Sequence, residues 1–494
     1  MKKVIALLLI LVLLPTISWA TPPDFSGAIN DEYTYEEIVF ITGKPIKFVG
    51  TYTISETAKD TEKAVTYKLT KFIPEDKTIN ASITRSMKYV TTYTKRNDKG
   101  QTTAQTKVDK FSETIKIGAD SYKLVDYQFS KSDIIDNRPA ADYYSGNITG
   151  RKIYSINNNQ GTVTMSISGG NVGYENFWGN TETQLMDYDV SYEKAANNDA
   201  DAVSWQGTVS IQTADSKTKT LRYSDNDASF TSFYGGYLRT TNREMVSKYD
   251  YNLPRFDEDD QATNKRDRGI LQLNLKMVPK LERLIVQKFR DIQGHWAEEA
   301  IAKLYSLDVF EEESTFFSPN IPLTRIEFTK AIIKACNIRT SLETAKKTAP
   351  KRNQPPEVSP FTDLDVGHSS YEYVKDALGK QIITGVSSDQ FKPNDPLTRA
   401  QAINIMIRAL GFESKAPSPG YYTSFTDDNR IPNWARDSIY VAQEINLITG
   451  DDYNRVNPNK VVTRAEASSM LVRFLEFLEK DLQKDYRENI INFR

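Results

Sequence analysis

The chain has 494 residues, of which 39% are hydrophobic and 26% charged, with 63 Lys plus Arg against 65 Asp plus Glu. At about 150 residues per domain, this length predicts roughly three domains, and the composition is that of a folded protein and not of a polytopic membrane protein. Because basic and acidic residues balance, no global positive field exists to hold nucleic acid, which we exclude as a partner.

Histidine and cysteine are scarce, which limits the possible chemistry. The chain has two histidines, His295 and His368, and one cysteine, Cys336, all after residue 290. A Ser-His-Asp triad, a Cys-His pair or a His/Cys zinc site therefore cannot be built from the first 290 residues, whereas catalysis by carboxylates alone is still possible. One cysteine also excludes an intrachain disulfide. We expect no cofactor.

The N-terminus has the pattern of a secretory signal peptide. Met1–Lys3 is positively charged, Val4–Leu14 is an unbroken apolar run, and Ser18-Trp19-Ala20 is a small-x-small cleavage signal. The apolar run is shorter than the ~20 residues of a spanning helix. We therefore expect residues 1–20 to be removed, the mature protein to be secreted, and no membrane insertion.

Residues 21–286 alternate between apolar and polar side chains, as half-buried antiparallel strands do. Examples are Ile46 and Phe48, Val163 to Ile167, and Leu271 to Met277. Segments rich in Gly and Asn predict turns between the strands. These are 97–100, 157–161 and Ser168-Gly169-Gly170. The pattern predicts an all-β antiparallel sandwich or meander, of either one large domain or two.

Two features of this half suggest ligands without specifying them. Aromatic residues cluster at Tyr174, Phe177 and Trp178, and again around the Gly235-Gly236 turn at Phe230, Phe233, Tyr234 and Tyr237. Such rings can stack on sugars, but filling a sheet core is the stronger interpretation. The acidic run 257–260 offers oxygen ligands for calcium but lacks the spacing of a calcium loop, so a solvated linker is preferred.

The chain repeats one unit three times after residue 286. Each copy has a Phe-x-Asp start, a helical pattern, a Phe-x-Pro or Val-x-Pro step, and a Thr-Arg step that opens a second helix. Pro and Arg are always six residues apart, in the pairs Pro319 and Arg325, Pro393 and Arg399, and Pro458 and Arg464. Each helix-loop-helix unit is too small to bury a core alone, so we expect the three to pack on one another.

The Thr-Arg step predicts a capping box, in which Thr and a Glu or Gln three residues later satisfy N–H groups at the helix start. The residues are Thr324 with Glu327, Thr398 with Gln401, and Thr463 with Glu466. Capping does not explain the arginines, because the helix dipole disfavours a cation there. A helix start with a guanidinium is a natural carboxylate or phosphate site, although an internal partner such as Asp291, Asp363 or Asp427 remains an alternative.

These motifs together resemble three tandem S-layer homology domains, covering residues 289 to about 478. The resemblance implies an all-α pseudo-trimer that binds secondary cell wall polysaccharide on peptidoglycan, through a pyruvylated sugar whose carboxylate meets the motif arginine. The predicted division of the chain begins with a signal peptide at 1–20 and a β-rich half at 21–286. The three S-layer homology domains follow at 287–340, 360–412 and 423–480, separated by linkers at 341–359 and 413–422. A helical tail at 481–494 ends the chain.

The resemblance also assigns a binding role to residues around each arginine. The full set is Arg325, Arg399, Arg464, Asp291, Asp363, Asp427, Trp296, Trp434, Gly385 and Gly450. The copies are unequal, since Glu312 stands where the others have Gly385 and Gly450, and Ser369 where they have Trp296 and Trp434. We expect the groove of Arg464 to be the most intact. His295 is predicted to pack or hydrogen-bond, and Cys336 to be a core residue.

The sequence thus predicts a secreted, non-enzymatic surface protein held non-covalently to the wall, as an S-layer component or an S-layer-associated protein. S-layer subunits, or further copies of itself, are additional expected partners. Two alternatives concern the β-rich half: an anchored enzyme such as a glycoside hydrolase, or an adhesin that binds carbohydrate. A cleft with facing carboxylates favours the enzyme, an exposed row of aromatic rings the adhesin, and long free sheet edges lattice assembly.

Overall fold

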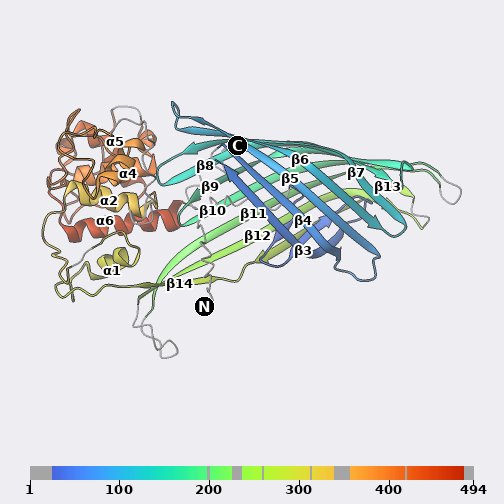
Figure 1. The fold of residues 1–494 in the computed structure, drawn as a ribbon, viewed down its shortest axis with the longest axis horizontal. Helices are drawn as coiled ribbons and strands as arrows, with labels where there is room; N and C mark the ends of the chain where they lie inside the picture. Colours follow the sequence, from blue (N-terminus) through green and yellow to red (C-terminus); the bar gives the residue numbers. More distant parts are fainter. Residues whose placement is uncertain are drawn as a thin grey trace, which may run out of the picture.

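The computed structural model describes residues 25–59, 61–196, 201–224, 236–258, 261–311, 314–338, 357–417 and 420–482. The expected signal peptide, Glu312, the aromatic residues Phe230, Phe233 and Tyr234, and most of the linker 341–359 and of the tail 481–494 lie outside these ranges. The described chain forms a long antiparallel sheet with a group of helices at one end (Figure 1).

In the described ranges, fourteen strands form one sheet in the order of the sequence, from β1 to β13, with β14 paired to β12. Most are long, so that sixteen residues span about 50 Å. The strands are β1 (Ile29–Asn30), β2 (Tyr35–Val39), β3 (Ile46–Lys59), β4 (Glu62–Pro74), β5 (Ala81–Arg96), β6 (Gln101–Ile117), β7 (Asp120–Asn137), β8 (Ala141–Ile156), β9 (Gly161–Asn176), β10 (Gly179–Lys194), β11 (Val203–Ser224), β12 (Gly236–Phe256), β13 (Ala262–Lys276) and β14 (Lys280–Ile285).

The predicted antiparallel all-β architecture of this half is confirmed, but the sandwich alternative is wrong because all strands belong to one sheet. The turn predicted at Ser168-Gly169-Gly170 is also wrong, since both glycines lie inside β9. A Cβ atom on Gly169 would lie 2.0 Å from the Leu185 carbonyl oxygen on β10, so the close approach of the strands requires glycine there. The other two predicted turns join β5 to β6 and β8 to β9.

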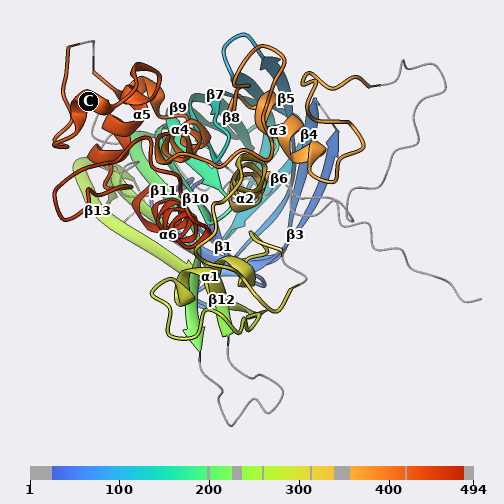
Figure 2. The same ribbon diagram turned by 90° about the vertical axis from the view of Figure 1, so that its left-hand side faces the viewer.

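The sheet curves into a trough whose interior is filled by the N-terminal segment (Figure 2). Strand β2 pairs with β3, and β1 lies against β12 and β13. The hydroxyl of Tyr249 donates to the Gly27 carbonyl at 2.6 Å, and Gly27 has φ +81 and no room for a Cβ, which would lie 2.4 Å from Ile211. A single chain segment thus replaces the second layer of a sandwich.

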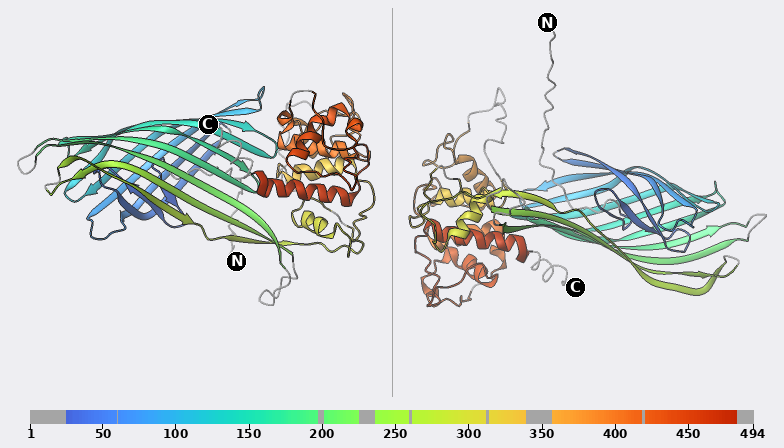
Figure 3. Two further views of the ribbon diagram at one scale, coloured as in Figure 1. Left: turned by 180° about the vertical axis from the view of Figure 1, so that it is seen from behind. Right: turned by 90° about the horizontal axis from the view of Figure 1, so that it is seen from below.

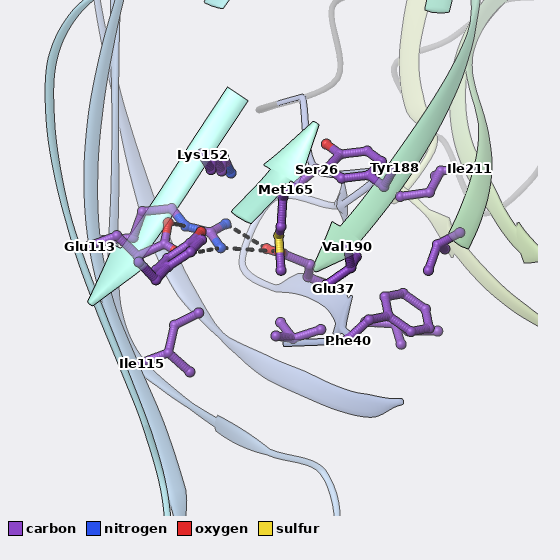
Figure 4. Close-up of a pocket in the computed structure, with 15 residues that line it drawn as sticks. Ser26, Glu37, Phe40, Glu113, Ile115, Lys152, Met165, Tyr188, Val190 and Ile211 are labelled. Atoms are coloured by element: carbon purple, nitrogen blue, oxygen red, sulfur yellow. Dashed lines mark hydrogen bonds and ion pairs between the residues drawn. The ribbon is translucent and has the colours of Figure 1, made fainter. Parts of the chain in front are cut away.

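A buried ion network ties this inner segment to the trough wall (Figure 4). Arg85 on β5 donates to Glu37 on β2 at 2.5 Å and to Glu113 on β6 at 2.6 Å, and Tyr154 donates to Glu113 at 2.9 Å. Burial alone would raise the pKa of Glu113, but Arg85 and Lys152 outweigh it, so the pKa is lowered and the carboxylate stays charged. The two carboxylates are therefore balanced inside the core by the guanidinium fork of Arg85 together with the buried ammonium of Lys152.

The helices stand in three pairs, one for each repeated unit. They are α1 (Glu298–Ser306) and α2 (Arg325–Ala335), α3 (Tyr371–Gly379) and α4 (Arg399–Leu410), and α5 (Asn433–Glu444) and α6 (Arg464–Glu476). Short 3₁₀ turns occupy Glu413–Lys415 and Asp428–Arg430, and a π-helical turn follows α6 at Phe477–Asp481. One hydrophobic core runs through all three units, as expected from their small size.

The prediction of an all-α C-terminal half is wrong. The extended residues before each capping threonine pair with one another as antiparallel bridges, Pro322 with Thr463, Thr324 with Pro396, and Thr398 with Val461. Backbone hydrogen bonds from Leu323 to Val462, from Val462 to Leu397 and from Leu397 to Leu323, of 2.9 to 3.0 Å, close this ring. The units are therefore joined by a small three-way β connection as well as by helix packing.

The helical units are docked on one end of the sheet, as Figure 1 and Figure 3 show. Their core includes Ala140, Ala141, Tyr174 and Trp178 from the β7–β8 and β9–β10 ends. The Ala140 amide donates to the Ala409 carbonyl at 2.9 Å, near the C-terminus of α4. Apolar burial and backbone hydrogen bonds thus hold the two halves in a defined orientation. In the described part of the chain, none of the helices combines the length and apolar character needed to cross a membrane.

Candidate functional site

All three capping boxes are formed at the starts of α2, α4 and α6. The hydroxyl of Thr398 accepts from the Gln401 amide, and the Gln401 side chain accepts from the Thr398 amide at 3.0 Å. Thr324 with Glu327 and Thr463 with Glu466 make the same pair of bonds. The threonine and the Glu or Gln of the motif are accounted for by helix capping.

The backbone N–H groups at these helix starts are not left for a ligand. The amides of Arg325, Arg399 and Arg464 donate to the carbonyls of Asp395, Lys460 and Ile321, each in the following unit, at 2.9 to 3.1 Å. The next amide in each helix also donates to the neighbouring unit. An anion at these positions therefore meets the guanidinium and not the free helix end, which differs from the sequence-based expectation.

The three aspartates of the Phe-x-Asp starts hold loops and do not pair with the arginines. Asp363 accepts from the amides of Phe391 and Lys392 at 2.9 and 2.7 Å, and Lys392 has φ +57. Asp291 binds the amides of Phe317 and Ser318, and Asp427 those of Val456 and Asn457, in the same way. Burial acts to raise the pKa of Asp291 and of Asp363, but the hydrogen bonds from these amides outweigh it, so the pKa of both carboxyl groups is lowered. Their role is to fix the loop before each Thr-Arg step.

Each motif arginine reaches across to the next unit. Arg325 donates to the Thr384 carbonyl at 2.7 Å, and Arg399 to the Thr449 carbonyl at 3.2 Å, directly before Gly385 and Gly450. The structure therefore brings Arg399, and not Arg464, beside Gly450. A Cβ on Gly450 would lie 2.7 Å from the Asn454 side chain, so the tight loop itself requires glycine.

Arg464 points in the same cyclic direction, toward the first unit. It lies 4.6 Å from the centre of the Phe317 ring, and its guanidinium is 3.5 Å from the Glu327 carboxylate. An internal carboxylate thus stands beside this arginine. The expectation that the groove of Arg464 is the most intact does not agree with this arrangement.

Arg325 and Arg399 differ from Arg464 because no carboxylate of the described residues forms an ion pair with them. Burial lowers the pKa of both arginines, with Asp395 and Glu466 respectively giving partial compensation from a distance. Arg325 is only 8% exposed and lies over the Phe391 ring at 5.2 Å. Arg399 is half-buried at the edge of an open groove.

The Arg399 groove has a volume of about 270 Å³ and is built from all three units. Trp296 from the first unit lines it with a side chain that is 65% exposed. The third unit contributes Gly450, Arg455 and Arg473, among others. Sequence reasoning placed Trp296, Arg399 and Gly450 in binding sites but did not show that they share one.

Charges in this groove leave an excess of cations. The carboxylate of Asp451 is held by Arg455 at 2.8 Å, which lowers the pKa of Asp451. The carboxylate of Glu466 is held by Lys460 at 2.6 Å. Arg399 and Arg473 remain without a carboxylate partner among the described residues, and Arg473 helps to lower the pKa of Arg399. The groove is therefore suited to an anion with an aromatic ring beside it.

Trp434, the two histidines and Cys336 lie outside the Arg399 groove. Trp434 is 54% exposed at the start of α5 and does not line the Arg399 groove. The Nδ1 atoms of His295 and His368 accept from backbone amides two residues on, at 3.2 and 3.0 Å. Cys336 is buried, which raises the pKa of its thiol to about 12, as suits a core residue.

In the β half, the described aromatic residues of both clusters pack and do not form a platform. Tyr174 and Trp178 are buried against the helical units, and Tyr237 is 3% exposed. Within the described ranges, no group of three or more His, Cys, Asp or Glu side chains is arranged to hold a metal ion.

Comparison with known proteins identifies the repeated units. Residues 288–329, 360–403 and 424–468 match the model of the S-layer homology domain. An endoglucanase of a Bacillus species is 36% identical over 135 residues, which are 26% of this chain and 14% of that protein. The surface-layer 125 kDa protein of Lysinibacillus sphaericus is 24% identical over 204 residues, 40% of this chain and 16% of that protein.

A cellulosome-anchoring protein of Acetivibrio thermocellus is 34% identical over 99 residues, which are 20% of this chain and 22% of that protein. The chain thus carries three tandem S-layer homology domains, and it is similar over part of its length to proteins named as a surface-layer protein, a cellulosome-anchoring protein and an endoglucanase. It spans less than a quarter of the length of each of these relatives.

Proposed function

We propose that this is a secreted bacterial surface protein, held non-covalently to the cell wall by its three S-layer homology domains. The domains bind secondary cell wall polysaccharide on peptidoglycan. Residues 1–20 direct export, and the sheet is displayed outward, in an S-layer or in association with one. The relatives whose names state a surface-layer or anchoring role support this assignment.

The observation that carries the proposal is the guanidinium of Arg399, which forms no ion pair with a carboxylate of the described residues and stands in an open groove. A ketal carboxylate of a pyruvylated sugar fits this position, because it supplies the charge that the described protein residues do not supply there. The exposed ring of Trp296 offers a face for the sugar beside it. Arg473 extends the positive charge along the groove toward further sugar units.

The direction of the helices supports a role as an anchor. The C-terminus of α4 meets the sheet through the bond between Ala140 and Ala409, whereas Arg399 begins the same helix. A helix of 12 residues is about 18 Å long, so the start of α4 lies about that far from the contact between Ala140 and Ala409. In α4, the arginine and the contact with the sheet therefore stand at opposite ends of one helix.

No reaction is needed for this role. Three relatives are named as an endoglucanase of a Bacillus species, the exoglucanase XynX of Acetivibrio thermocellus and an amylopullulanase of Thermoanaerobacterium thermosulfurigenes. Their matches cover 26 to 38% of this chain, which gives no support for an activity in the sheet. We therefore assign the β half to surface display.

The test is co-sedimentation of the full-length mature protein with native wall sacculi and with sacculi stripped of secondary polymer. We expect binding to native sacculi only, and at least a tenfold loss for Arg399→Gln, in line with a lost charge-assisted contact of about 1.5 to 3 kcal/mol. Arg151→Gln, on an exposed part of β8, is the control for loss of one positive charge. Equal binding to stripped sacculi would contradict the proposal.

A further inference from the structure

A buried polar cluster lies inside the trough near its helical end and is not involved in wall binding. It consists of Lys131 and Asp133 on β7, Asn171 on β9, and Glu182 and Gln184 on β10. All five side chains are at least nine-tenths buried. The register places them together, because Gln184 is opposite Asn171, and Asn171 is opposite Gly146, which is opposite Asp133.

The cluster is held together by contacts to one carboxylate oxygen. Glu182 Oε1 accepts from Gln184 at 2.9 Å and from Asn171 and Lys131 at 3.3 Å each. Lys131 also pairs with Asp133 Oδ2 at 3.0 Å. Every member is therefore one contact away from Glu182 or Lys131.

Three oxygen atoms of this cluster have no hydrogen-bond donor among the described residues. They are Asp133 Oδ1, Asn171 Oδ1 and Gln184 Oε1. Exchanging the oxygen and nitrogen of the Asn171 or Gln184 side-chain amide does not supply the missing donors. Each amide nitrogen already donates to Glu182, and after the exchange an oxygen would face the carboxylate. Each buried acceptor without a donor costs about 1 to 3 kcal/mol, so three in one cluster require an explanation.

The charge of the cluster does not balance either. Asp133 and Glu182 bring two negative charges against one positive charge from Lys131. Asp215, opposite Glu182 on β11, pairs with Arg243 at 2.5 Å, and this pair is neutral in itself. Burial raises the pKa of Glu182 despite Lys131, whereas the two carboxylates raise the pKa of Lys131 against the effect of burial. With both carboxylates ionised, the cluster lacks one positive charge.

We propose that this cluster binds one monovalent metal cation of the sodium type, with Asp133 Oδ1, Asn171 Oδ1 and Gln184 Oε1 as ligands. Hard cations prefer carboxylate and amide oxygens, which are the atoms left without donors. A single charge neutralises the excess, whereas a divalent ion would leave a net positive charge beside Lys131. Gly146 is needed for the Asp133 carboxylate to reach this position, since Asp133 Oδ1 lies only 2.3 Å from where a Cβ of residue 146 would be. The ion stiffens the sheet end that carries the helical units.

The test is thermal unfolding of the full-length mature protein in sodium chloride and in N-methyl-D-glucamine chloride at equal ionic strength. We expect Tm to rise with sodium by about 1 to 3 °C for each tenfold increase, and to stay constant in the organic cation. Asp133→Asn removes the charge excess and should abolish the sodium effect. Asp126→Asn, on the exposed face of the same strand, should keep it.

Two further measurements make the outcome decisive. If Asp133→Asn does not fold, Gln184→Met removes one ligand oxygen at similar volume and should weaken the sodium effect at least tenfold in concentration. Sodium-23 relaxation of the wild-type protein should show a bound population that Gln184→Met reduces. Equal Tm in both salts without sodium-23 broadening, or a shift with calcium alone, would overturn the proposal.

Discussion

Replacing Glu327 by Gln should open a further anion site at Arg464. The Glu327 carboxylate lies 3.5 Å from the Arg464 guanidinium, where a ligand carboxylate would bind. At this distance two unit charges interact by about 1.2 kcal/mol in water, and the pair is partly exposed, at 12% and 41%. We take about 1 kcal/mol, or about fivefold in affinity, as the expected gain.

The substitution is mild because the same capping position holds Gln401 in the second unit, where the capping box is intact. In the third unit, Lys460 already neutralises the corresponding Glu466. Among the described residues, Arg464 is therefore the one motif arginine beside a capping carboxylate that no lysine neutralises.

The assay is calorimetric titration of the full-length mature protein with short fragments of the secondary wall polysaccharide. Glu327→Gln should add a second, weaker class of sites, and combining it with Arg464→Gln should remove that class again. Glu75→Gln changes the charge equally on an exposed part of the sheet and should leave the titration unchanged. An identical isotherm for Glu327→Gln and the wild type would refute the assignment of Glu327 as the competitor.

Three further predictions concern stability. Thr398→Ala should lower the free energy of unfolding by about 1 kcal/mol in urea titration, whereas Thr398→Ser keeps the cap; equal losses would contradict a capping role. Gly450→Ala should cost about 1 to 3 kcal/mol because its Cβ meets Asn454, while Gly367→Ala, with no atom within 4 Å, should be silent in the same experiment. Burial raises the pKa of Glu175 to about 7, so the unfolded chain binds fewer protons than the folded one between pH 4.5 and 7. Stability should therefore fall over that range, and Glu175→Gln should flatten the curve.

The repeated units were largely predictable because their signals are local. Threonine and a Glu or Gln three residues apart indicate a helix start wherever they occur, and all three capping boxes are formed. The site itself depends on which unit follows which in space. Arg399 meets Gly450 across a unit boundary, and the extended segments pair through backbone atoms that carry no side-chain signal.

In the sheet, the alternation of apolar and polar residues indicated the strands but not which residues fill the interior of the trough. Arg85, Glu37 and Glu113 are charged residues at inward positions, which their own strands do not distinguish from exposed ones. Arg85 is 48 residues from Glu37 and 28 residues from Glu113 in the sequence. The ion network therefore forms only when the N-terminal segment packs into the trough. Gly169 likewise indicated a turn in the sequence, whereas in the structure it is required by the close approach of Leu185 on the neighbouring strand.

The most direct test of the anchoring account compares two arginines at equivalent positions in the three-way arrangement. Arg399→Gln removes one positive charge from the open groove, and Arg464→Gln removes the same charge from the position beside Glu327. The purified secondary wall polysaccharide is titrated into each full-length variant. The account predicts at least a tenfold loss of affinity for Arg399→Gln and less than a twofold change for Arg464→Gln. Equal losses in both variants, or a larger loss for Arg464→Gln, would contradict it.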